Sequence, residues 1–217
     1  MIKCCIFDMD GTLLDTLVTI EHYLNITLEE FGLPLMREDE CRRYVGRGAK
    51  NLVTQTLNAR LSYDEEYFNR FYEKYSESYD NAPDYLTEPY DGICELIDEL
   101  LLRGIKIGVL SNKPHSATEP IVRKFFGDKI SYVSGGKDGV PLKPAPDGVY
   151  LVLGELGFDR SECMYIGDSE IDVYTAKAAE VELPVAVSWG FRTHEELIAA
   201  GAKTIIDSPE KILSLLK

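Results

Sequence analysis

The sequence predicts an α/β protein whose core is a Rossmann-like, doubly wound parallel sheet carrying an inserted all-helical domain. Two observations lead to this fold class. From residue 88 onward, short apolar segments alternate with helical patterns, which is typical of parallel strands joined by crossover helices. A further strand-like segment stands near residue 1, and the residues between the two parts show helical spacing only. We therefore expect a core of residues 1–15 and 88–217 and a helical domain of residues 16–87.

The first predicted strand is Ile2–Phe7, a short apolar segment that should be buried. Asp8 follows it directly and should stand at the carboxyl end of the sheet, where open α/β sheets bind their ligands. Asp10 comes two residues later, and Gly11 allows the chain to leave the strand sharply. Two carboxylates about 4–5 Å apart repel by roughly 3–4 kcal/mol, so a cation or a shared proton is expected between them. An ordinary Asp-Gly turn is the alternative for this stretch alone.

The inserted part consists of four expected helices. Apolar residues recur every three or four positions over 17–31, and a charged helix is expected over 37–44. A basic loop with two glycines, 45–50, precedes a third helix near 52–57. The fourth helix, 64–79, is rich in tyrosine and phenylalanine. We expect its aromatic side chains to form the core of the helical domain rather than a stacking surface for a ligand.

The alternating part begins with a helix over 91–102. The following elements are expected in this order: strand 105–110, helix from Ser116, strand 130–133, helix 146–156, strand 163–166, helix to about 180, strand 184–187, helix from Thr193, strand 204–206 and a last helix with Pro209 in its first turn. Ser116 with Glu119, and Thr193 with Glu196, have the spacing of capping boxes. Strands alternating with helices in this way predict one parallel sheet.

Composition and charge exclude several classes of function. The formal net charge of −14 disfavours unassisted binding to nucleic acid or to an anionic membrane. No stretch reaches the roughly 18 apolar residues of a membrane span, and the first residues lack the pattern of a signal peptide. The five cysteines are odd in number and form no Cys-x-x-Cys pair, so we expect reduced thiols and a cytoplasmic protein.

Three of the predicted strands end in polar residues, which are Asp8, Ser111–Asn112 and Asp168. Because parallel strands share one carboxyl edge, these residues should meet, with Lys143 and Asp172 close by. Carboxylates without histidine or cysteine favour a hard cation, and Mg²⁺ is the usual partner of phosphates. A metal, a lysine and a nucleophilic carboxylate together describe phosphoryl transfer through an aspartyl-phosphate.

The order of these motifs resembles that of the haloacid dehalogenase-like hydrolase superfamily, and more narrowly its phosphoglycolate phosphatase branch, which carries a helical cap. The resemblance covers nearly the whole chain. It rests on four motifs in order: Asp8-Met9-Asp10-Gly11-Thr12-Leu13-Leu14-Asp15, Ser111-Asn112-Lys113, Lys143-Pro144-Ala145-Pro146, and Gly167-Asp168-Ser169-Glu170-Ile171-Asp172.

The resemblance implies roles for three aspartates. Asp8 would be the nucleophile that takes the phosphoryl group, and it would bind Mg²⁺ together with Asp168. Asp10 would protonate the leaving oxygen and then activate the attacking water, and its main-chain oxygen would also bind the metal. We expect the Asp10 side chain to point at the cap while Asp8 faces the metal.

The remaining motif residues would support these three. Ser111 and the N–H of Asn112 would bind the oxygens of the transferred phosphoryl group, and Lys143 would offset its charge. Asp172 would hold either the waters of the metal or Lys143. Thr12 would help to orient the general acid.

The same resemblance narrows the reaction. Asp10 and Thr12 favour a phosphoester over a halide substrate, and Ile20 stands where sugar-phosphate mutases carry a cap histidine. Arg47 and Lys50 are candidates for contact with an anionic end of the substrate, although a plain helix–helix loop is an equal alternative. We expect Trp189-Gly190-Phe191 to pack near the rim of the site.

The expected function is therefore Mg²⁺-dependent hydrolysis of a small phosphomonoester by a phosphoglycolate phosphatase-like enzyme, acting as a monomer or homodimer. An inorganic pyrophosphatase, a nucleotidase and a sugar-phosphate phosphatase or mutase are alternatives within the superfamily. A non-catalytic phospho-acceptor or binding module is the alternative from another class.

Overall fold

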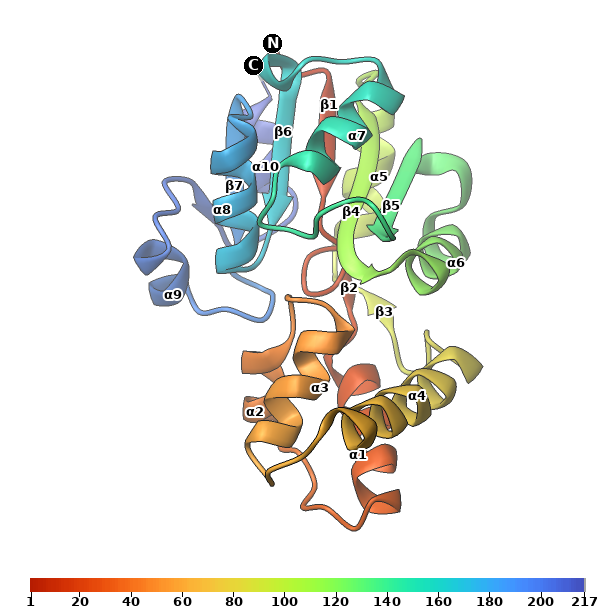
Figure 1. Ribbon diagram of the computed structural model, residues 1–217. Helices are drawn as coiled ribbons and strands as arrows, with labels where there is room; N and C mark the ends of the chain where they lie inside the picture. Colours follow the sequence, from red (N-terminus) through yellow and green to blue (C-terminus); the bar gives the residue numbers. More distant parts are fainter. Residues whose placement is uncertain (217) are drawn as a thin grey trace.

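The computed structural model describes residues 1–216, which contain a six-stranded parallel sheet in the order β5-β4-β1-β6-β7-β8 (Figure 1). The strands are β1 (Cys4–Phe7), β4 (Lys106–Pro114), β5 (Tyr132–Gly136), β6 (Cys163–Gly167), β7 (Leu183–Val187) and β8 (Ile205–Ile206). In chain order, β4 and then β5 are added on one side of β1. The next strand, β6, pairs with the other side of β1. Strand order thus reverses beside β1, where doubly wound sheets bind their ligands. The predicted fold class is confirmed.

Helices cover both faces of this sheet. One face packs against α5 (Ile93–Leu102), α6 (His115–Phe126) and α10 (Lys211–Leu215). The other face packs against α7 (Asp147–Leu156) and α8 (Glu170–Ala179). The sheet is therefore buried on both sides, which explains why its strands are continuous apolar runs in the sequence.

The central strand β1 shows how this burial positions the next residue. Cys5 and Phe7 belong to one core cluster, whereas Cys4 and Ile6 belong to the other, and all four are fully buried. This alternation follows from the two-residue period of a strand. The backbone N–H of Asp8 continues the ladder to the carbonyl of Ile166 at 2.8 Å. Asp8 is thus held at the carboxyl edge by the strand itself.

A helical insert lies at this carboxyl end of the sheet (Figure 1). It consists of α1 (Leu17–Glu30), α2 (Glu38–Tyr44), α3 (Ala49–Asn58) and α4 (Glu65–Asn81). These helices pack around a second hydrophobic cluster, which includes Leu24, Leu28, Leu57 and Phe71. The sheet domain adds Ala117 and Phe191 to this cluster, so the insert is packed against the edge at which Asp8 stands.

A two-stranded ribbon joins the insert to the sheet domain. Strand β2 (Leu14–Asp15) pairs antiparallel with β3 (Glu88–Pro89), so the chain enters and leaves the insert at the same place. Sequence analysis did not predict this ribbon, because two-residue strands are too short to show a periodic pattern.

The second strand of the sheet is longer than expected. β4 continues past Leu110 to Pro114, and β5 extends with it, so that Pro114 pairs with Gly136. As a result α6 begins at His115 with Pro114 as its N-cap, and no side chain caps it. The predicted capping box at Ser116 is therefore wrong.

The C-terminal helices are short. The predicted capping box before α9 (His194–Ala199) is confirmed, because the Thr193 side chain accepts from the backbone N–H of Glu196. Helix α10 begins only at Lys211, so Pro209 lies just before it rather than in its first turn. No helix within residues 1–216 has the length and apolar character needed to cross a membrane.

Candidate active site

Three neighbouring strands bring the polar residues of the motifs to one edge. Asp8 follows β1, Ser111 and Asn112 lie in β4, and Asp168 follows β6, in the strand order β4-β1-β6. Carboxylate oxygens of Asp8, Asp168 and Asp172 all lie within 4.8 Å of one another. The sheet topology thus assembles a buried acidic cluster from distant parts of the chain.

Lys143 enters this cluster from the loop after β5. Its Nζ lies 2.8 Å from Asp8 Oδ1 and 2.8 Å from Asp172 Oδ1. Burial opposes the charge of this ammonium, but the carboxylates of Asp172 and Asp8 outweigh burial and raise the pKa of Lys143. Asn112 fixes the backbone of the loop, because its side chain accepts from the Lys143 N–H at 2.8 Å and donates to the Lys143 carbonyl at 3.0 Å.

Asp172 is the anchor for Lys143. Its Oδ1 also accepts from the Tyr165 hydroxyl at 2.9 Å, and its Oδ2 accepts from the Ser169 hydroxyl at 2.6 Å. Burial would raise the pKa of Asp172, but the Lys143 charge and these hydrogen bonds lower it. Of the two roles expected for Asp172, the structure shows the contact with Lys143.

The other two carboxylates, Asp8 and Asp168, have raised pKa values. Burial, followed by the negative charge of Asp172, raises the pKa of Asp8 well above its ordinary value. The same causes raise the pKa of Asp168 to about 7. Two buried carboxylates with raised pKa values and only oxygen donors fit a hard divalent cation, which would favour their ionised forms. Asp8 and Asp168 are the residues that would hold it.

The side chain of Asp168 is oriented from two sides. Its Oδ1 accepts from the Thr12 hydroxyl at 2.9 Å, and its Oδ2 accepts from the Phe191 N–H at 2.8 Å. Gly11, at φ +82°, must be glycine here, because a Cβ would lie 2.4 Å from Asp168 Oδ2. The loop of Phe191 therefore holds a site residue, which is more than the packing role expected for it.

Asp10 is oriented by residues that sequence analysis did not identify. Its Oδ1 accepts from the Thr16 hydroxyl at 2.7 Å and from Lys113 Nζ at 2.6 Å. Thr12, which was expected to help orient Asp10, follows the turn at Gly11 and donates its hydroxyl to Asp168 instead. Lys113 belongs to the motif Ser111-Asn112-Lys113, but nothing in the sequence indicates that its side chain contacts Asp10.

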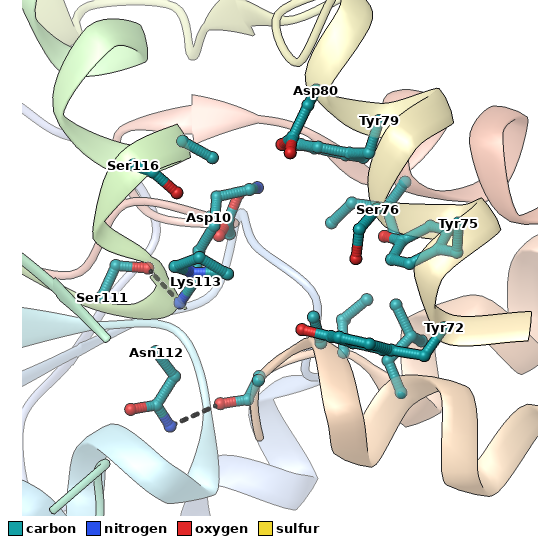
Figure 2. A pocket seen from close by; sticks show the side chains of 18 of the residues that line it. Asp10, Tyr72, Tyr75, Ser76, Tyr79, Asp80, Ser111, Asn112, Lys113 and Ser116 are labelled. Carbon is teal, nitrogen blue, oxygen red and sulfur yellow. Dashed lines mark hydrogen bonds and ion pairs between the residues drawn. The ribbon is translucent and has the colours of Figure 1, made fainter. Parts of the chain in front are cut away.

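Asp10 and Lys113 border a cavity of about 230 Å³ between the sheet edge and the insert (Figure 2). Residues of the sheet domain form one wall of the cavity. The insert forms the other wall with the start of α3 and one side of α4. Ser111 and Ser116 line the core side. A cavity of this size suits a small substrate.

The aromatic side of α4 lines the cavity. Tyr72, Tyr75 and Tyr79 face it, together with Ser76 and Asp80 (Figure 2). Tyr75 and Tyr79 also belong to the insert core, as expected for this helix. Successive turns of α4 place the tyrosines along one stripe, so that the same side chains pack in the insert core and border the cavity.

The two cations proposed for the insert lie outside the cavity lining. The Arg47 guanidinium approaches Glu170 of α8 at 3.3 Å, and Lys50 Nζ lies 6.0 Å from the centre of the Tyr72 ring. Residues of the same loop do line the cavity, namely Gly46, Gly48 and Ala49. The Asn112 side chain donates to the Gly46 carbonyl at 3.0 Å. The loop therefore reaches the site, while its cationic side chains do not.

A buried arginine ties the insert to the sheet domain. The Arg192 Nε lies 2.8 Å from Glu170 Oε2, and its guanidinium donates to the carbonyls of Arg42 and Val45 at the end of α2. Arg42 in turn donates to the Gly190 carbonyl at 3.2 Å. Sequence analysis missed Arg192, because nothing in its neighbours indicates that it would be buried.

Comparison with known proteins agrees with this geometry. A family profile described as haloacid dehalogenase-like hydrolase matches residues 5–186. The phosphoglycolate phosphatase of Rhodospirillum rubrum is 34% identical, over 95% of this chain and 88% of its own. The N-acetylmuramic acid 6-phosphate phosphatase of Pseudomonas aeruginosa is 32% identical, over 99% and 95% respectively.

A solved structure shows the same similarity. The crystal structure of a proposed phosphoglycolate phosphatase from Lactobacillus delbrueckii subsp. bulgaricus superimposes with a TM-score of 0.93 at 33% identity. The match covers 99% of this chain and 98% of that one. The chain therefore belongs to the haloacid dehalogenase-like hydrolase family, in its phosphoglycolate phosphatase-like branch, and is a phosphatase.

Proposed function

We propose that the enzyme hydrolyses small phosphomonoesters in two displacements, with Asp8 as the nucleophile and Mg²⁺ as the cofactor. One observation carries the proposal: Lys143 Nζ lies 2.8 Å from Asp8 Oδ1 at the reversal point of the sheet, and Asp168 lies close enough to Asp8 to share a cation with it. A carboxylate nucleophile needs the positive charge of such a lysine and cation before a phosphoryl group can approach it.

Asp8 has one oxygen available for attack. Within residues 1–216, Oδ1 accepts from the Met9 N–H and faces Lys143, and no contact to Oδ2 is found there. Oδ2 would attack phosphorus as the bond to the leaving oxygen breaks, which gives an aspartyl-phosphate and an alcohol. Water would then attack phosphorus, the bond to Asp8 would break, and inorganic phosphate would leave.

Asp10 would move the protons for both steps. It would give one to the leaving oxygen and take one from the attacking water, which restores its starting state. The side chain borders the cavity rather than the acidic cluster, and Thr16 and Lys113 hold its Oδ1. This placement supports the expected division of roles between Asp8 and Asp10.

The transferred phosphoryl group would be bound on the core side. Ser111 Oγ accepts from the Lys113 N–H at 3.1 Å, so its own proton remains for a phosphoryl oxygen. The N–H of Asn112 and the ammonium of Lys143 would bind the others. When bound, Mg²⁺ would neutralise charge on the phosphoryl oxygens, and Asp8, Asp168 and the Asp10 carbonyl would be its protein ligands.

The helical insert would act as a cap over residues 1–15 and 88–217. Closure of such a cap excludes water and favours small substrates. Phosphoglycolate is the first candidate substrate, because relatives named phosphoglycolate phosphatase match nearly the whole chain. The relative named for N-acetylmuramic acid 6-phosphate makes sugar phosphates the second class to compare. A cytoplasmic location and a monomeric or dimeric state complete the proposal.

Phosphate release with Mg²⁺ tests this proposal. The panel contains phosphoglycolate, p-nitrophenyl phosphate, sugar phosphates, nucleotides and pyrophosphate. We expect turnover by the wild type, and a loss of at least about 1,000-fold in Asp8→Asn, which lacks the nucleophile. Asp128→Asn is the matched control, because Asp128 is exposed and lies in the turn Gly127–Lys129 that precedes β5.

Two results would contradict the proposal. Absence of Mg²⁺-dependent turnover on every compound would exclude the phosphatase mechanism. Transfer of a single phosphoryl group to Asp8 from acetyl phosphate, without release of phosphate, would instead identify a phospho-acceptor module.

A further inference from the structure

We propose that Lys113 determines substrate specificity by binding a carboxylate carried by the leaving group. The inference rests on the phosphatase function proposed above. It assigns the recognition of the leaving group to a residue of the sheet domain, instead of to the loop cations Arg47 and Lys50.

Lys113 is held at the boundary between the two halves of the cavity. Its side chain is 8% exposed, and its Nζ lies 2.6 Å from Asp10 Oδ1. On the insert side, the same Nζ lies 5.1 Å from the centre of the Tyr79 ring, within the range of a cation–π contact. Figure 2 shows Lys113 beside Asp10, across the cavity from the α4 side chains. The ammonium thus stands where the non-phosphate part of a substrate would lie.

The charges around the cavity leave few alternatives. Among the lining residues that the structure describes, Lys113 is the only cation, and the others that carry charge are Asp8, Asp10 and Asp80. Lys143 is occupied by two carboxylates at the phosphoryl end. Lys113 has one carboxylate partner, Asp10, so among the described lining residues it is the cation that an anionic leaving group can reach.

The position of Asp10 sets the reach of this contact. A proton donor must lie about 2.6–3.2 Å from the oxygen that it protonates. The ester oxygen and the Lys113 ammonium would then lie on either side of the Asp10 carboxyl group, each within hydrogen-bond distance of it. A carboxylate on the carbon next to the ester oxygen would fit this distance. Thr16 still donates to Asp10 Oδ1 when the flexible lysine turns to the substrate.

A purely structural role predicts different behaviour. If Lys113 only positions Asp10, its loss slows the hydrolysis of all phosphomonoesters alike. If it binds the leaving group, the loss depends on whether a carboxylate is present. A pair of substrates that differ only in this group separates the two roles.

The test compares phosphoglycolate with 2-hydroxyethyl phosphate, in which a neutral CH₂OH replaces the carboxylate. We expect wild-type enzyme to prefer phosphoglycolate in kcat/KM. In Lys113→Met the ratio of the two kcat/KM values should fall about 10- to 100-fold, the effect of one hydrogen bond between charged groups. Lys50→Met is the matched control, because Lys50 is exposed and lies outside the cavity lining, and the ratio should stay within about twofold.

Binding provides a second readout in case Lys113→Met is inactive. In the Asp8→Asn background, calorimetry should show that Lys113→Met weakens binding of phosphoglycolate at least about tenfold and leaves 2-hydroxyethyl phosphate within about twofold. An unchanged ratio in both measurements, or a wild-type preference for the neutral compound, would overturn the proposal while the phosphatase function stands. Failure of wild type to hydrolyse any phosphomonoester would instead refute the proposed function.

Discussion

At the scale of single residues, the site depends on how each buried charge is compensated. Lys143 faces Asp8 and Asp172, and Asp172 has hydrogen bonds to both of its oxygens. Asp8 and Asp168 also accept hydrogen bonds, but burial and the charge of Asp172 outweigh them and raise both pKa values. The cluster is therefore divided into an anchor, Asp172, whose pKa is lowered, and two carboxylates whose ionisation a cation would favour.

We predict that Asp172→Asn destabilises the fold by roughly 3 kcal/mol, because removing one partner of a buried ion pair leaves the Lys143 ammonium undercompensated. Urea unfolding of the wild type and the variant would measure this difference. Glu180→Gln is the control, since its exposed pair with Arg160 should contribute less than about 1 kcal/mol. Equal stability of Asp172→Asn and wild type would show that Asp172 is dispensable as an anchor.

The affinity for a divalent cation should depend on pH through Asp168. Because its pKa is raised to about 7 in the metal-free protein, a proton must leave before the carboxylate can bind a metal. Affinity should therefore fall as pH decreases below about 7. Calorimetry with Mg²⁺ between pH 5.5 and 8.5 would measure this.

Thr12→Val tests the cause of that dependence. The Thr12 hydroxyl donates to Asp168 and lowers its pKa, so its removal should move the transition to higher pH. An affinity that does not change across this range, in either protein, would be inconsistent with titration of Asp168.

At the scale of elements, Arg192 connects the loop after β7 with the end of α2. We predict that Arg192→Met increases amide hydrogen exchange in α2 and α3 about tenfold, because hydrogen bonds from a charged donor are lost. Exchange in β1 and β6 should not change. Mass spectrometry of the exchanged protein would resolve these segments, and Arg160→Met, which removes an exposed pair, is the matched control.

An effect spread evenly over the protein would indicate general destabilisation by Arg192→Met instead of a local contact. No effect in α2 would mean that the other contacts, such as those of Asn112 with Gly46 and of Arg42 with Gly190, are sufficient to hold the insert.

The sequence predicted those site residues that directly follow, or lie in, the strands of the sheet. Asp8, Ser111 and Asp168 could be brought together because an apolar strand precedes each of them and parallel strands end at one edge. Side-chain direction was harder to predict. Thr12 and Thr16 have the same chemistry, and only the turn at Gly11 decides that the first contacts Asp168 and the second Asp10.

Contacts between the two halves of the chain could not be predicted from local pattern. Arg47 looks like a ligand-binding residue because it follows Gly46, yet it lies against Glu170. Whether Arg192 is buried or exposed depends on the docking of α2, which no periodicity in the sequence describes. The lining role of Tyr72 has the same origin, because it depends on which side of α4 faces the sheet domain.

At the scale of the whole molecule, the sheet domain and the helical insert together enclose a small cavity. The sheet domain contributes the groups that react with phosphorus, while the insert contributes most of the wall that surrounds the rest of the substrate. Movement of the insert relative to the sheet domain would open the cavity and break the contacts that Ala117 and Phe191 make with the core of the insert.

The ribbon predicts that the insert can be removed. Asp15 and Glu88 are directly paired, so an Asn-Gly turn in place of residues 16–87 should close the two strands as a hairpin. The shortened protein should fold and bind Mg²⁺ through Asp8 and Asp168, with phosphoglycolate turnover strongly reduced because the α4 wall is gone. Circular dichroism and calorimetry would check this, and an unfolded product would show that the sheet needs the insert.

Both ends of the insert meet at one pair of residues in the ribbon, Asp15 and Glu88. The ribbon is therefore a point at which the insert could be exchanged. A different helical unit with similarly spaced ends could be spliced between Asp15 and Glu88 without changing a single strand of the sheet. Exchange of this segment between homologues should then change which organic group of the substrate is preferred. The residues that react with phosphorus would stay the same.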